Sequence, residues 1–327
     1  MKKKKVVTVS AGTGQAIMLS GLQKYSRRLD LAAIVSVSDN GGHTALLRQQ
    51  YGIPAVGDVR RCLTALASNR RLRREYELRT PLGSSIGNEH IVVHLLETGS
   101  LSQAVRVAAA ELKLIGTVLP VTNVPVDICA RLDDGTEVYG EWQIIDRLPR
   151  RPIAEMFIKP DAEALAESVR AIEQADLVVI PPGSLRTGII SCLLTRGIRE
   201  ALQSFAGKVV FVVNIMTHPG QTDGFSAADH VAEFERYAGR RPDVVIQNIG
   251  VVPTRLLKHY AAIGSEPVYG LIDLPNIAVV SGNFIPPEDN FMARTERVGA
   301  FKKWTHALVH DGASLAAAIM KILDGHT

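Results

Sequence analysis

The chain has 327 residues, of which 46% are hydrophobic, enough to bury a large core as one α/β domain or as one domain with an insertion. Its 37 basic and 33 acidic residues leave a net charge of +4, which is too balanced to indicate a nucleic-acid polymer as partner. The basic runs at 2–5 and 70–74 are interpreted as solvated surface, because no aromatic residues interleave with them.

The cysteines and the apolar stretches indicate the cellular compartment of the protein. Cys62, Cys129 and Cys192 are far apart and odd in number, with no metal-type pairing, so we expect small buried residues in a reducing environment. The lysines near the start lead into a strand pattern rather than a signal peptide, and no apolar stretch approaches the roughly 20 residues of a membrane span. A cytoplasmic protein without a membrane partner is predicted.

The first part of the chain predicts alternating strands and helices. Val6–Val9 and Leu31–Val37 are continuous apolar, β-branched runs, typical of buried parallel strands. Between them the apolar residues recur at helical spacing, at Ile17, Met18, Leu22, Tyr25 and Leu29. Further helices are predicted to begin at Gly57, Gly87 and Leu101.

The pattern changes over residues 114 to about 158. Val126–Leu132 alternates between apolar and polar residues, Asp133–Gly135 is a turn signal, and Thr136–Tyr139 is a matching strand. We therefore predict a β-hairpin insertion that covers one end of the main sheet.

From Asp161 onward the alternation of helix and strand returns. Helices are predicted at 161–174, up to about 205, around 227–237, from Pro253 and at 313–323, with strands at 177–180, 209–213 and 244–246. No internal repeat and no low-complexity linker divides the chain, so one domain is expected over residues 1–327.

Three short loops that follow apolar strands indicate a ligand site. They are Ser10–Gly14, Ser38–Gly42 and Pro181–Ser184. Small residues between a strand and a helix let backbone N–H groups approach an anion, and the helix dipole favours negative charge there. Several such loops predict a phosphorylated ligand at the carboxyl edge of a parallel sheet.

The glycine turn after the first strand has two readings. Gly12-Thr13-Gly14 is shorter than the full dinucleotide fingerprint and lacks its third glycine. It is either a tight strand-to-helix turn or a phosphate site made by the amides of Thr13, Gly14 and Gln15.

Two aspartates have alternative roles. Asp39 follows the second strand, where a dinucleotide fold places its ribose-binding carboxylate, but it can also bind a hard cation beside phosphate. Asp58 lies at a helix N-terminus, where the spacing favours a plain capping residue.

Two later loops are expected at the same sheet edge. In the first, Gly183 and Ser184 keep amides that can face a ligand, and Arg186 points either to phosphate or to solvent. In the second, Asn214 can read a base or a sugar hydroxyl. The loop histidine His218 is a candidate acid–base group, although a surface role is commoner for such a residue.

Several catalytic signatures do not occur in the sequence. There is no nucleophile elbow, no Walker-type phosphate loop and no HExxH or paired-cysteine metal motif. From the residues alone, the function is therefore limited to an α/β protein that binds a nucleotide or another phosphorylated ligand, with or without catalysis.

The order of these blocks resembles one superfamily, which joins YvcK-like gluconeogenesis factors to CofD-like 2-phospho-L-lactate transferases. The resemblance covers nearly the whole chain and favours the YvcK-like branch. It rests on the following blocks: Val35–Gly42, Ile53–Leu63, Val118–Thr122, Asp134-Gly135 with Gly140-Glu141, Pro182–Leu185 and Asn214–Gly224.

The resemblance implies a Rossmann-like, mostly parallel sheet with helices on both faces and a β-rich insertion at about 114–158. It implies a nucleotide ligand, a UDP-sugar in the YvcK-like branch, and a role in carbon metabolism and cell-wall precursor supply. By analogy with the transferases, Asp39 and Asp58 would hold Mg²⁺, and Tyr260 resembles a tyrosine near the nucleotide sugar. Family analogy also suggests a homodimer.

Some positions depart from the family pattern. The opening glycine run is reduced to Ser10–Gly14, His43-Thr44-Ala45 replaces a small turn, and Arg186 and His218 replace a tyrosine and a glutamine. In addition, Val309 takes the place of a basic residue before His310-Asp311. These changes affect the expected ligand more than the expected fold.

The residues and the resemblance together leave three functions: a UDP-sugar-binding regulatory protein, an Mg²⁺-dependent transferase of phosphorus-containing groups that binds GDP, and a protein that binds NAD. All three use one candidate site. In the transferase Asp39 and Asp58 are the metal ligands, whereas in the NAD-binding protein Asp39 holds the ribose. The ligand-binding residues of the site are predicted to be Gly12, Thr13, Gly14, Gln15, Ser38, Asn40, Gly41, Gly42, Asn88, Pro182, Gly183, Ser184, Leu185, Arg186, Asn214, Met216, Thr217 and Tyr260.

Overall fold

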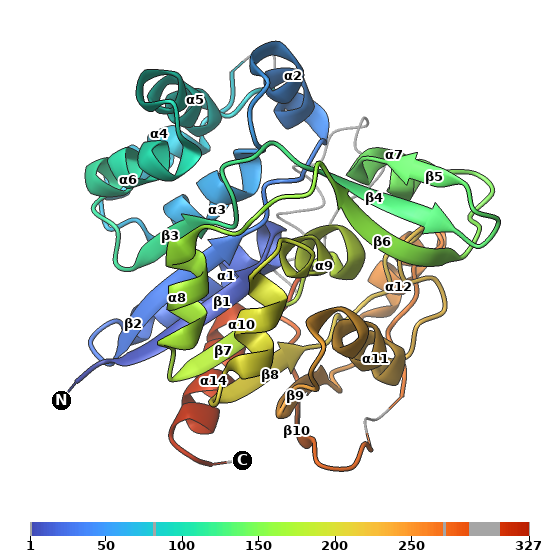
Figure 1. Ribbon diagram of the computed structural model, residues 1–327. Coiled ribbons are helices and arrows are strands. Elements are labelled where there is room, and N and C mark those ends of the chain that lie inside the picture. Colours follow the sequence, from blue (N-terminus) through green and yellow to red (C-terminus); the bar gives the residue numbers. More distant parts are fainter. Residues whose placement is uncertain (1, 81–82, 271–272, 288–307, 327) are drawn as a thin grey trace.

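A seven-stranded parallel sheet forms the centre of the computed structural model, which describes residues 2–80, 83–270, 273–287 and 308–326 (Figure 1). The strand order is β10-β9-β8-β7-β1-β2-β3, and every neighbouring pair is parallel. The strands are β1 (Lys4–Ser10), β2 (Leu29–Val35), β3 (Thr117–Pro120), β7 (Leu177–Ile180), β8 (Lys208–Val212), β9 (Val244–Asn248) and β10 (Ala278–Gly282).

Helices cover both faces of this sheet, as predicted. Helices α1 and α14 pack together behind the sheet in Figure 1, and α8, α9, α10 and α11 form a contacting group in front of it. The helices are α1 (Gly12–Leu22), α2 (Gly42–Tyr51), α3 (Gly57–Leu66), α4 (Arg70–Glu77), α5 (Ile86–Thr98), α6 (Leu101–Leu112), α7 (Glu141–Asp146), α8 (Ala166–Glu173), α9 (Ile190–Leu193), α10 (Ile198–Ser204), α11 (Ala227–Ala238), α12 (Thr254–Ala261) and α14 (Gly312–Leu323).

The second strand is displaced relative to the prediction. Leu29 was expected on the first helix, but it begins β2, where it pairs with Lys4 of β1. The strand ends at Val35. Two residues later the carbonyl of Val37 accepts a hydrogen bond at 2.9 Å from the N–H of Ala55, a residue outside the sheet.

Two predicted helices are shorter than expected. The helix predicted at 161–174 spans only Ala166–Glu173. The helix predicted up to about 205 is divided into a π-helical turn (Leu185–Ile189), α9 and α10, and Gly197, at a φ of +97°, lies between the last two. Helices α2 and α4 and the edge strand β10 were not predicted.

The insertion has one more strand than the predicted hairpin and begins later in the sequence than predicted. The hairpin of β4 (Asp127–Leu132) and β5 (Glu137–Tyr139) is present, and β6 (Ile153–Lys159) pairs with β4 to complete a three-stranded antiparallel sheet. Thr117–Pro120, included in the predicted 114–158 range, instead pairs with β2 in the main sheet. The short helix α7 connects β5 to β6 and carries residues toward the main sheet.

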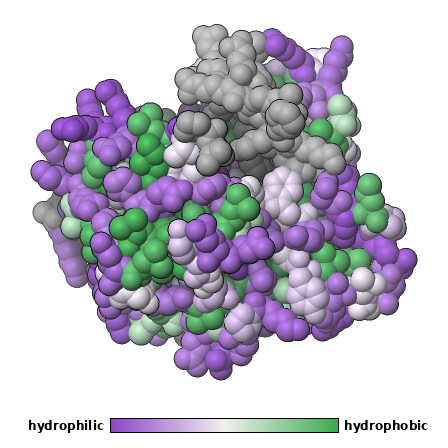
Figure 2. All heavy atoms as spheres, turned by 90° about the horizontal axis from the view of Figure 1, so that it is seen from above, coloured by the Kyte–Doolittle hydropathy of each residue, from purple (hydrophilic) through white to green (hydrophobic). Residues whose placement is uncertain are grey.

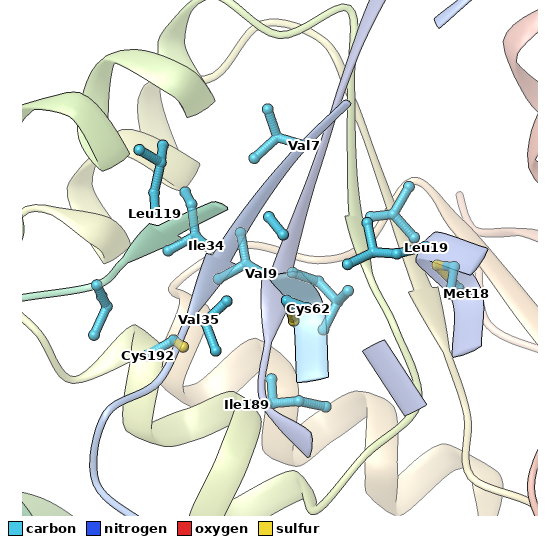
Figure 3. Packing of buried hydrophobic residues seen from close by; sticks show 14 of the residues in the cluster. Val7, Val9, Met18, Leu19, Ile34, Val35, Cys62, Leu119, Ile189 and Cys192 are labelled. Carbon is cyan, nitrogen blue, oxygen red and sulfur yellow. The ribbon is translucent and has the colours of Figure 1, made fainter. Parts of the chain in front are cut away.

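The core lies between the main sheet and its helices. Figure 3 shows Cys62 and Cys192 among apolar side chains that include Val9, Val35 and Ile189. All three cysteines are buried and unpaired with one another, as predicted, and the two core thiols have pKa values raised by burial.

The surface is mostly polar, with scattered apolar side chains. Figure 2 shows hydrophobic residues among polar ones on the face above the sheet, and the exposed apolar side chains of the molecule include Leu46, Val93 and Leu96. The arginines at 70, 71 and 74 are exposed on α4, as expected of solvated surface. Among the described residues, no helix combines the length and the apolar character that crossing a bilayer requires.

Candidate functional site

A cleft of about 440 Å³ lies at the point where the strand order reverses. The chain builds β1, β2 and β3 toward one edge of the sheet and β7, β8, β9 and β10 toward the other, so β1 and β7 meet in the middle. Residues that follow β1, β2, β7 and β8 line this cleft. Open α/β sheets bind their ligands at such a switch point, outside the carboxyl ends of the strands.

Most of the predicted site residues share this cleft, although they are distant in sequence. Those that line it are Gly12, Thr13, Gly14, Asp39, Gly41, Gly42, Asp58, Asn88, Pro182, Gly183, Ser184, Asn214, Met216, Thr217 and Tyr260. Gln15, Ser38, Asn40, Leu185 and Arg186 do not line it.

Four helices begin at the cleft without a side-chain cap. These are α1, α2, α3 and α5, whose capping residues are Ala11, Gly41, Val56 and Ser85. The first turns of α1 and α2 also contain no acidic residue. Uncapped N-terminal amides together with the positive end of the helix dipole favour an anion, such as phosphate.

The β1 and β7 loops meet at a glycine. A Cβ atom on Gly14 would lie 1.9 Å from the carbonyl oxygen of Pro182, so only glycine permits this approach. The amide of Asn214 holds the β7 loop on its other side, because its Oδ1 accepts from the N–H of Gly183 at 3.2 Å and its Nδ2 donates to the carbonyl of Gly183 at 2.8 Å. Asn214 therefore lines the cleft, but both functional groups of its amide position a loop.

The side chains of Gln15 and Ser38 hold the fold together, and neither residue lines the cleft. The contact of a phosphate with the backbone amide of Gln15 stays a prediction. Gln15 is fully buried, and its Nε2 donates to Thr8 Oγ1 and to the carbonyl of Ile34, both at 3.0 Å, which ties β1 to β2. The Ser38 hydroxyl is hydrogen-bonded to Ser191 at 2.7 Å and joins the β2 loop to α9.

Asn40 holds the insertion against the main sheet. Its Oδ1 accepts from the backbone N–H of Trp142 at 3.1 Å, and its Nδ2 donates to Gln143 Oε1 at 3.0 Å. Asn40 therefore accepts a hydrogen bond from a free N–H group in the first turn of α7, although it lies in a distant part of the chain. The Asn40 side chain is thus engaged within the fold and does not line the cleft, whereas its neighbours Asp39 and Gly41 do.

Arg186 and Leu185 also point elsewhere. Leu185 is 1% exposed and belongs to the core. The Nε of Arg186 donates to Glu233 at 2.8 Å, and its guanidinium lies over the ring of Phe225 at 5.2 Å. Both members of this ion pair are buried, so Arg186 points neither to phosphate nor to solvent, the two alternatives considered from the sequence.

The β2 side of the cleft gathers three carboxylates, namely Asp39, Asp58 and Glu141. Burial and the charge of Asp58 raise the pKa of Asp39, although the N–H of Gly41 donates to its Oδ1 at 2.7 Å. Burial and the charge of Asp39 raise the pKa of Glu141 to about 8. Thr187 Oγ1 donates to Glu141 at 2.8 Å. The pKa values show that negative charge is only partly compensated at this side of the cleft.

Three arginines line the same side of the cleft: Arg60, Arg61 and Arg79. Arg61 forms an ion pair with Asp58; burial lowers its pKa, but Asp58 and Asp39 raise the pKa by more. Arg60 is buried, donates from Nε to Asn88 Oδ1 at 3.0 Å, and has a pKa lowered to about 10 by burial and by the neighbouring Arg61 and Arg79. We name this side of the cleft, with its three carboxylates and three arginines, the charged arm.

The charged arm offers the kind of ligand atom that a divalent cation prefers, but few such ligands. Asp39 and Asp58 are hard oxygen ligands, and the raised pKa of Asp39 indicates a carboxylate that a cation would stabilise. Within the described part of the chain, however, no group of three or more histidine, cysteine or acidic side chains has the arrangement of a metal site. Mg²⁺ is typically held by one or two carboxylates, with phosphates and water completing its shell. Asp39 and Asp58 would supply that share and would place the cation beside bound phosphate.

The β8 side of the cleft has a different character. Ile215, Met216, Tyr260 and Leu308 line it and belong to a small apolar cluster separate from the main core. The hydroxyl of Tyr260 accepts from the N–H of Leu308 at 2.8 Å. Together with His310, which also lines the cleft, these residues form what we name the apolar arm.

Sequence reasoning missed several residues of the cleft, chiefly Glu141, Trp142, Arg60 and His310. Glu141 and Trp142 come from α7, so their arrival at the β2 loop depends on how the insertion folds back. The only signal for Glu141 in the sequence was the Gly140-Glu141 pair, which contributed to the family resemblance and to no site prediction. Trp142 lies against Gly41, since a Cβ there would be 2.3 Å from the indole Nε1.

Comparisons with known proteins identify the family. The family model described as "2-phospho-L-lactate transferase CofD" matches residues 6–285. Proteins of Thermotoga maritima and Aquifex aeolicus that bear a gluconeogenesis-factor name are 36% and 34% identical, over 84% and 99% of this chain and 87% and 98% of their own lengths. A gluconeogenesis factor of Halalkalibacterium halodurans is 34% identical over 82% of this chain and 84% of its own.

Solved structures agree with the sequence comparisons. A crystal structure from Bacillus halodurans, titled as a member of the upf0052 family, superimposes with a TM-score of 0.86 at 30% identity and covers 98% of this chain and 99% of the other. Because the family model, the relatives and the fold agree, the chain belongs to the CofD family and is a homologue of the gluconeogenesis factors.

Proposed function

We propose that this protein binds a nucleotide diphosphate ligand, a UDP-sugar, in the cleft at the switch point and acts as a regulatory binding protein. The observation that carries the proposal is that uncapped N-termini of α1 and α2 line the same cleft as Arg60, Arg61 and Arg79. This arrangement suits a diphosphate, because the amides and guanidinium groups both favour oxyanions.

The dimensions of the cleft also support an elongated ligand. The charged arm follows β2 and the apolar arm follows β8, and these strands are three positions apart in the sheet. At the ordinary strand spacing, that separation is about 14 Å. A diphosphate at the central glycine loops would leave one polar end of the ligand in the charged arm and one ring in the apolar arm.

The relatives suggest the cellular role. The names of the matched proteins refer to gluconeogenesis, and we extend that role to this chain: a cytoplasmic factor whose ligand reports on carbon metabolism and cell-wall precursor supply.

A second candidate function is transfer of a phosphorus-containing group. The observation in its favour is the group of three carboxylates, with Asp39 and Asp58 placed to hold Mg²⁺ beside a phosphate. A bound Mg²⁺ would polarise the transferred phosphoryl oxygens and lower the barrier to attack by an acceptor hydroxyl. Glu141 interacts with Asp39 and Asp58 in the same cleft and would be the candidate proton acceptor for that hydroxyl.

The test is calorimetric titration and thermal shift with UDP-N-acetylglucosamine, UDP-glucose, GDP and NAD, each with Mg²⁺ and with EDTA. UDP-sugar binding that persists in EDTA supports the regulatory proposal. GDP binding that disappears in EDTA supports the transferase, and binding of NAD alone supports a dinucleotide site. No binding by any of these ligands would contradict the proposal.

A matched pair of variants ties any binding to the cleft. Arg60→Gln removes a guanidinium that lines it, whereas Arg196→Gln removes an exposed guanidinium outside it. We expect the first to weaken UDP-sugar binding about tenfold or more, as for loss of a charge-assisted hydrogen bond, and the second to leave it unchanged. Equal affinities for both variants would place the ligand elsewhere.

A further inference from the structure

His310 occupies an unusual position in the apolar arm. It lies just before α14, is 6% exposed, and lines the cleft. Its Nε2 has no hydrogen-bond partner among the described residues, although it is shielded from the protein surface. A hydrogen bond with the backbone of Val213 contributes to the pKa of His310, and we assign it to Nδ1 because Nε2 has no partner.

The chemistry of this imidazole is determined by its surroundings. Burial lowers the pKa of His310 to about 4, so the ring is neutral at physiological pH. With Nδ1 donating its proton to the carbonyl of Val213, Nε2 carries only a lone pair. His310, a residue that lines the cleft, therefore carries a buried hydrogen-bond acceptor without a partner among the described residues.

An unpaired acceptor in an apolar setting is unfavourable. Ile215, Met216 and Leu308 of the apolar arm have no side-chain donor, and the Tyr260 hydroxyl in the same arm forms no hydrogen bond with this nitrogen. A buried acceptor without a partner destabilises a protein, and a ligand that supplies a donor recovers that free energy on binding. The apolar walls would accommodate a flat ring, and the acceptor would select a ring or ribose that carries an N–H or O–H group.

We propose that His310 Nε2 accepts a hydrogen bond from the nucleoside part of the ligand and thereby places that part in the apolar arm, with the phosphates at the central glycine loops. The inference rests on the proposed nucleotide-binding function and goes further, because it assigns the orientation of the ligand and one residue that determines specificity.

The chain contains a matched control for this residue. His230 is also buried, has Nδ1 paired with a backbone carbonyl, that of Ser226 at 2.8 Å, and has an Nε2 without a partner in the described structure. It does not line the cleft. The variants His310→Leu and His230→Leu thus remove the same chemistry inside and outside the site.

The experiment measures affinity for UDP and for inorganic pyrophosphate in the wild type and both variants. We expect His310→Leu to weaken UDP binding roughly 10- to 100-fold, the effect of leaving a buried donor unpaired, and to leave pyrophosphate binding within about twofold. His230→Leu should alter neither affinity. Equal affinity of His310→Leu and wild type for UDP would overturn the inference.

Ligand analogues test the same contact from the side of the ligand. UDP has three nucleoside donors, and 3-methyl-UDP, 2′-deoxy-UDP and 3′-deoxy-UDP each lack one of them. We expect one analogue to bind the wild type as weakly as UDP binds His310→Leu, with no further loss when the two changes are combined. Additive losses for all three analogues in His310→Leu would contradict the inference. If that variant folds poorly, equal affinity of the wild type for UDP and for all three analogues would contradict it as well.

Nitrogen NMR of the histidine side chains gives an independent readout. UDP should shift the Nε2 resonance of His310 toward that of a hydrogen-bonded acceptor and leave His230 unchanged. If UDP binds but the His310 resonance does not move, only this inference fails. If neither UDP nor pyrophosphate binds the wild type, the proposed function fails and this inference fails with it.

Discussion

The two arms of the cleft lie on the same sheet edge but differ in almost every physical property. The charged arm contains the carboxylates Asp39, Asp58 and Glu141 and the arginines Arg60, Arg61 and Arg79, whereas the apolar arm contains Met216, Tyr260 and Leu308 with the neutral imidazole of His310. Both follow buried parallel strands of similar sequence. The contrast arises from the segments that fold over the strand ends: α3 and α7 on one side, α12 and the approach to α14 on the other.

The comparison shows how a parallel sheet can offer different chemistry at its two sides of a switch point. The strands only set the spacing between the arms. The side chains that give each arm its character come largely from connections distant in sequence, which makes the arms independently testable.

The largest expected effect is on the free energy of unfolding, and it distinguishes an arginine that stabilises the fold from one that lines the cleft. Arg186→Gln should lower the free energy of unfolding by about 3–5 kcal/mol, because it leaves Glu233 as a buried charge without its main partner. Ligand affinity should not change, since Arg186 does not line the cleft. Urea denaturation and calorimetric titration measure the two quantities.

The contrasting variant is Arg61→Gln in the charged arm. Arg61 is about one third exposed but Asp58 is buried, so loss of their ion pair should lower the free energy of unfolding by about 2 kcal/mol, less than for Arg186→Gln. We expect UDP-sugar affinity to fall about tenfold, since one fewer cation faces the phosphates. If both arginine variants behaved alike in stability and binding, the division between fold charges and cleft charges would be incorrect.

The next effect concerns the contact between the β1 and β7 loops, which lies between the two arms. Gly14→Ala should lower the free energy of unfolding by about 3 kcal/mol and abolish ligand binding, because the added methyl would collide with the carbonyl of Pro182. Gly183→Ala is the control, since its Cβ would meet Ser10 Oγ at 3.2 Å and should cost less than about 1 kcal/mol. Similar Tm values for the two variants would show that the loops can separate freely.

The arms should also respond to pH in opposite directions. The Glu141 pKa is raised from 4.5 to about 8, so its contribution to stability is present below about pH 4.5 and is lost as the pH rises to about 8. The His310 pKa is lowered from 6.5 to about 4, so its contribution is present above about pH 6.5 and is lost as the pH falls to about 4.

Glu141→Gln should therefore gain about 3–4 kcal/mol of unfolding free energy relative to wild type between pH 5 and pH 8. His310→Gln should gain relative to wild type as the pH falls from 6.5 to 4. Urea denaturation across this range gives both differences. A constant offset for either variant would mean that the corresponding group titrates alike in the folded and unfolded chain.

The smallest expected effect lies at the rim of the charged arm. Trp142→Phe should weaken nucleotide binding about threefold, because a smaller ring keeps part of the contact area next to Gly41. Tyr139→Phe, on β5 just before α7 but outside the cleft, should have no effect. A tenfold loss for Trp142→Phe would move the main ligand contact from the glycine loops to the insertion.

Patterns local to a strand or helix were predictable. The runs at Val6–Val9 and Leu177–Ile180 form parallel strands as predicted, and Gly57 and Leu101 begin helices where the spacing indicated. The edge strand β10 was missed because Ala278–Gly282 is short and only half-buried, which leaves a weak apolar pattern. Helix α4 was missed because its composition is mostly charged and only Tyr76 is buried.

The sequence by itself determined the parallel sheet, the glycine loops at its carboxyl edge and the meeting of those loops in one cleft, because apolar periodicity and backbone geometry are properties of neighbouring residues. Only the tertiary structure decided which polar side chains face that cleft. Gln15 and Arg186 found buried partners in other elements, and Glu141 and His310 arrived from distant ones. A hydrogen bond depends on where both partners lie, and those positions are known only once the chain has folded.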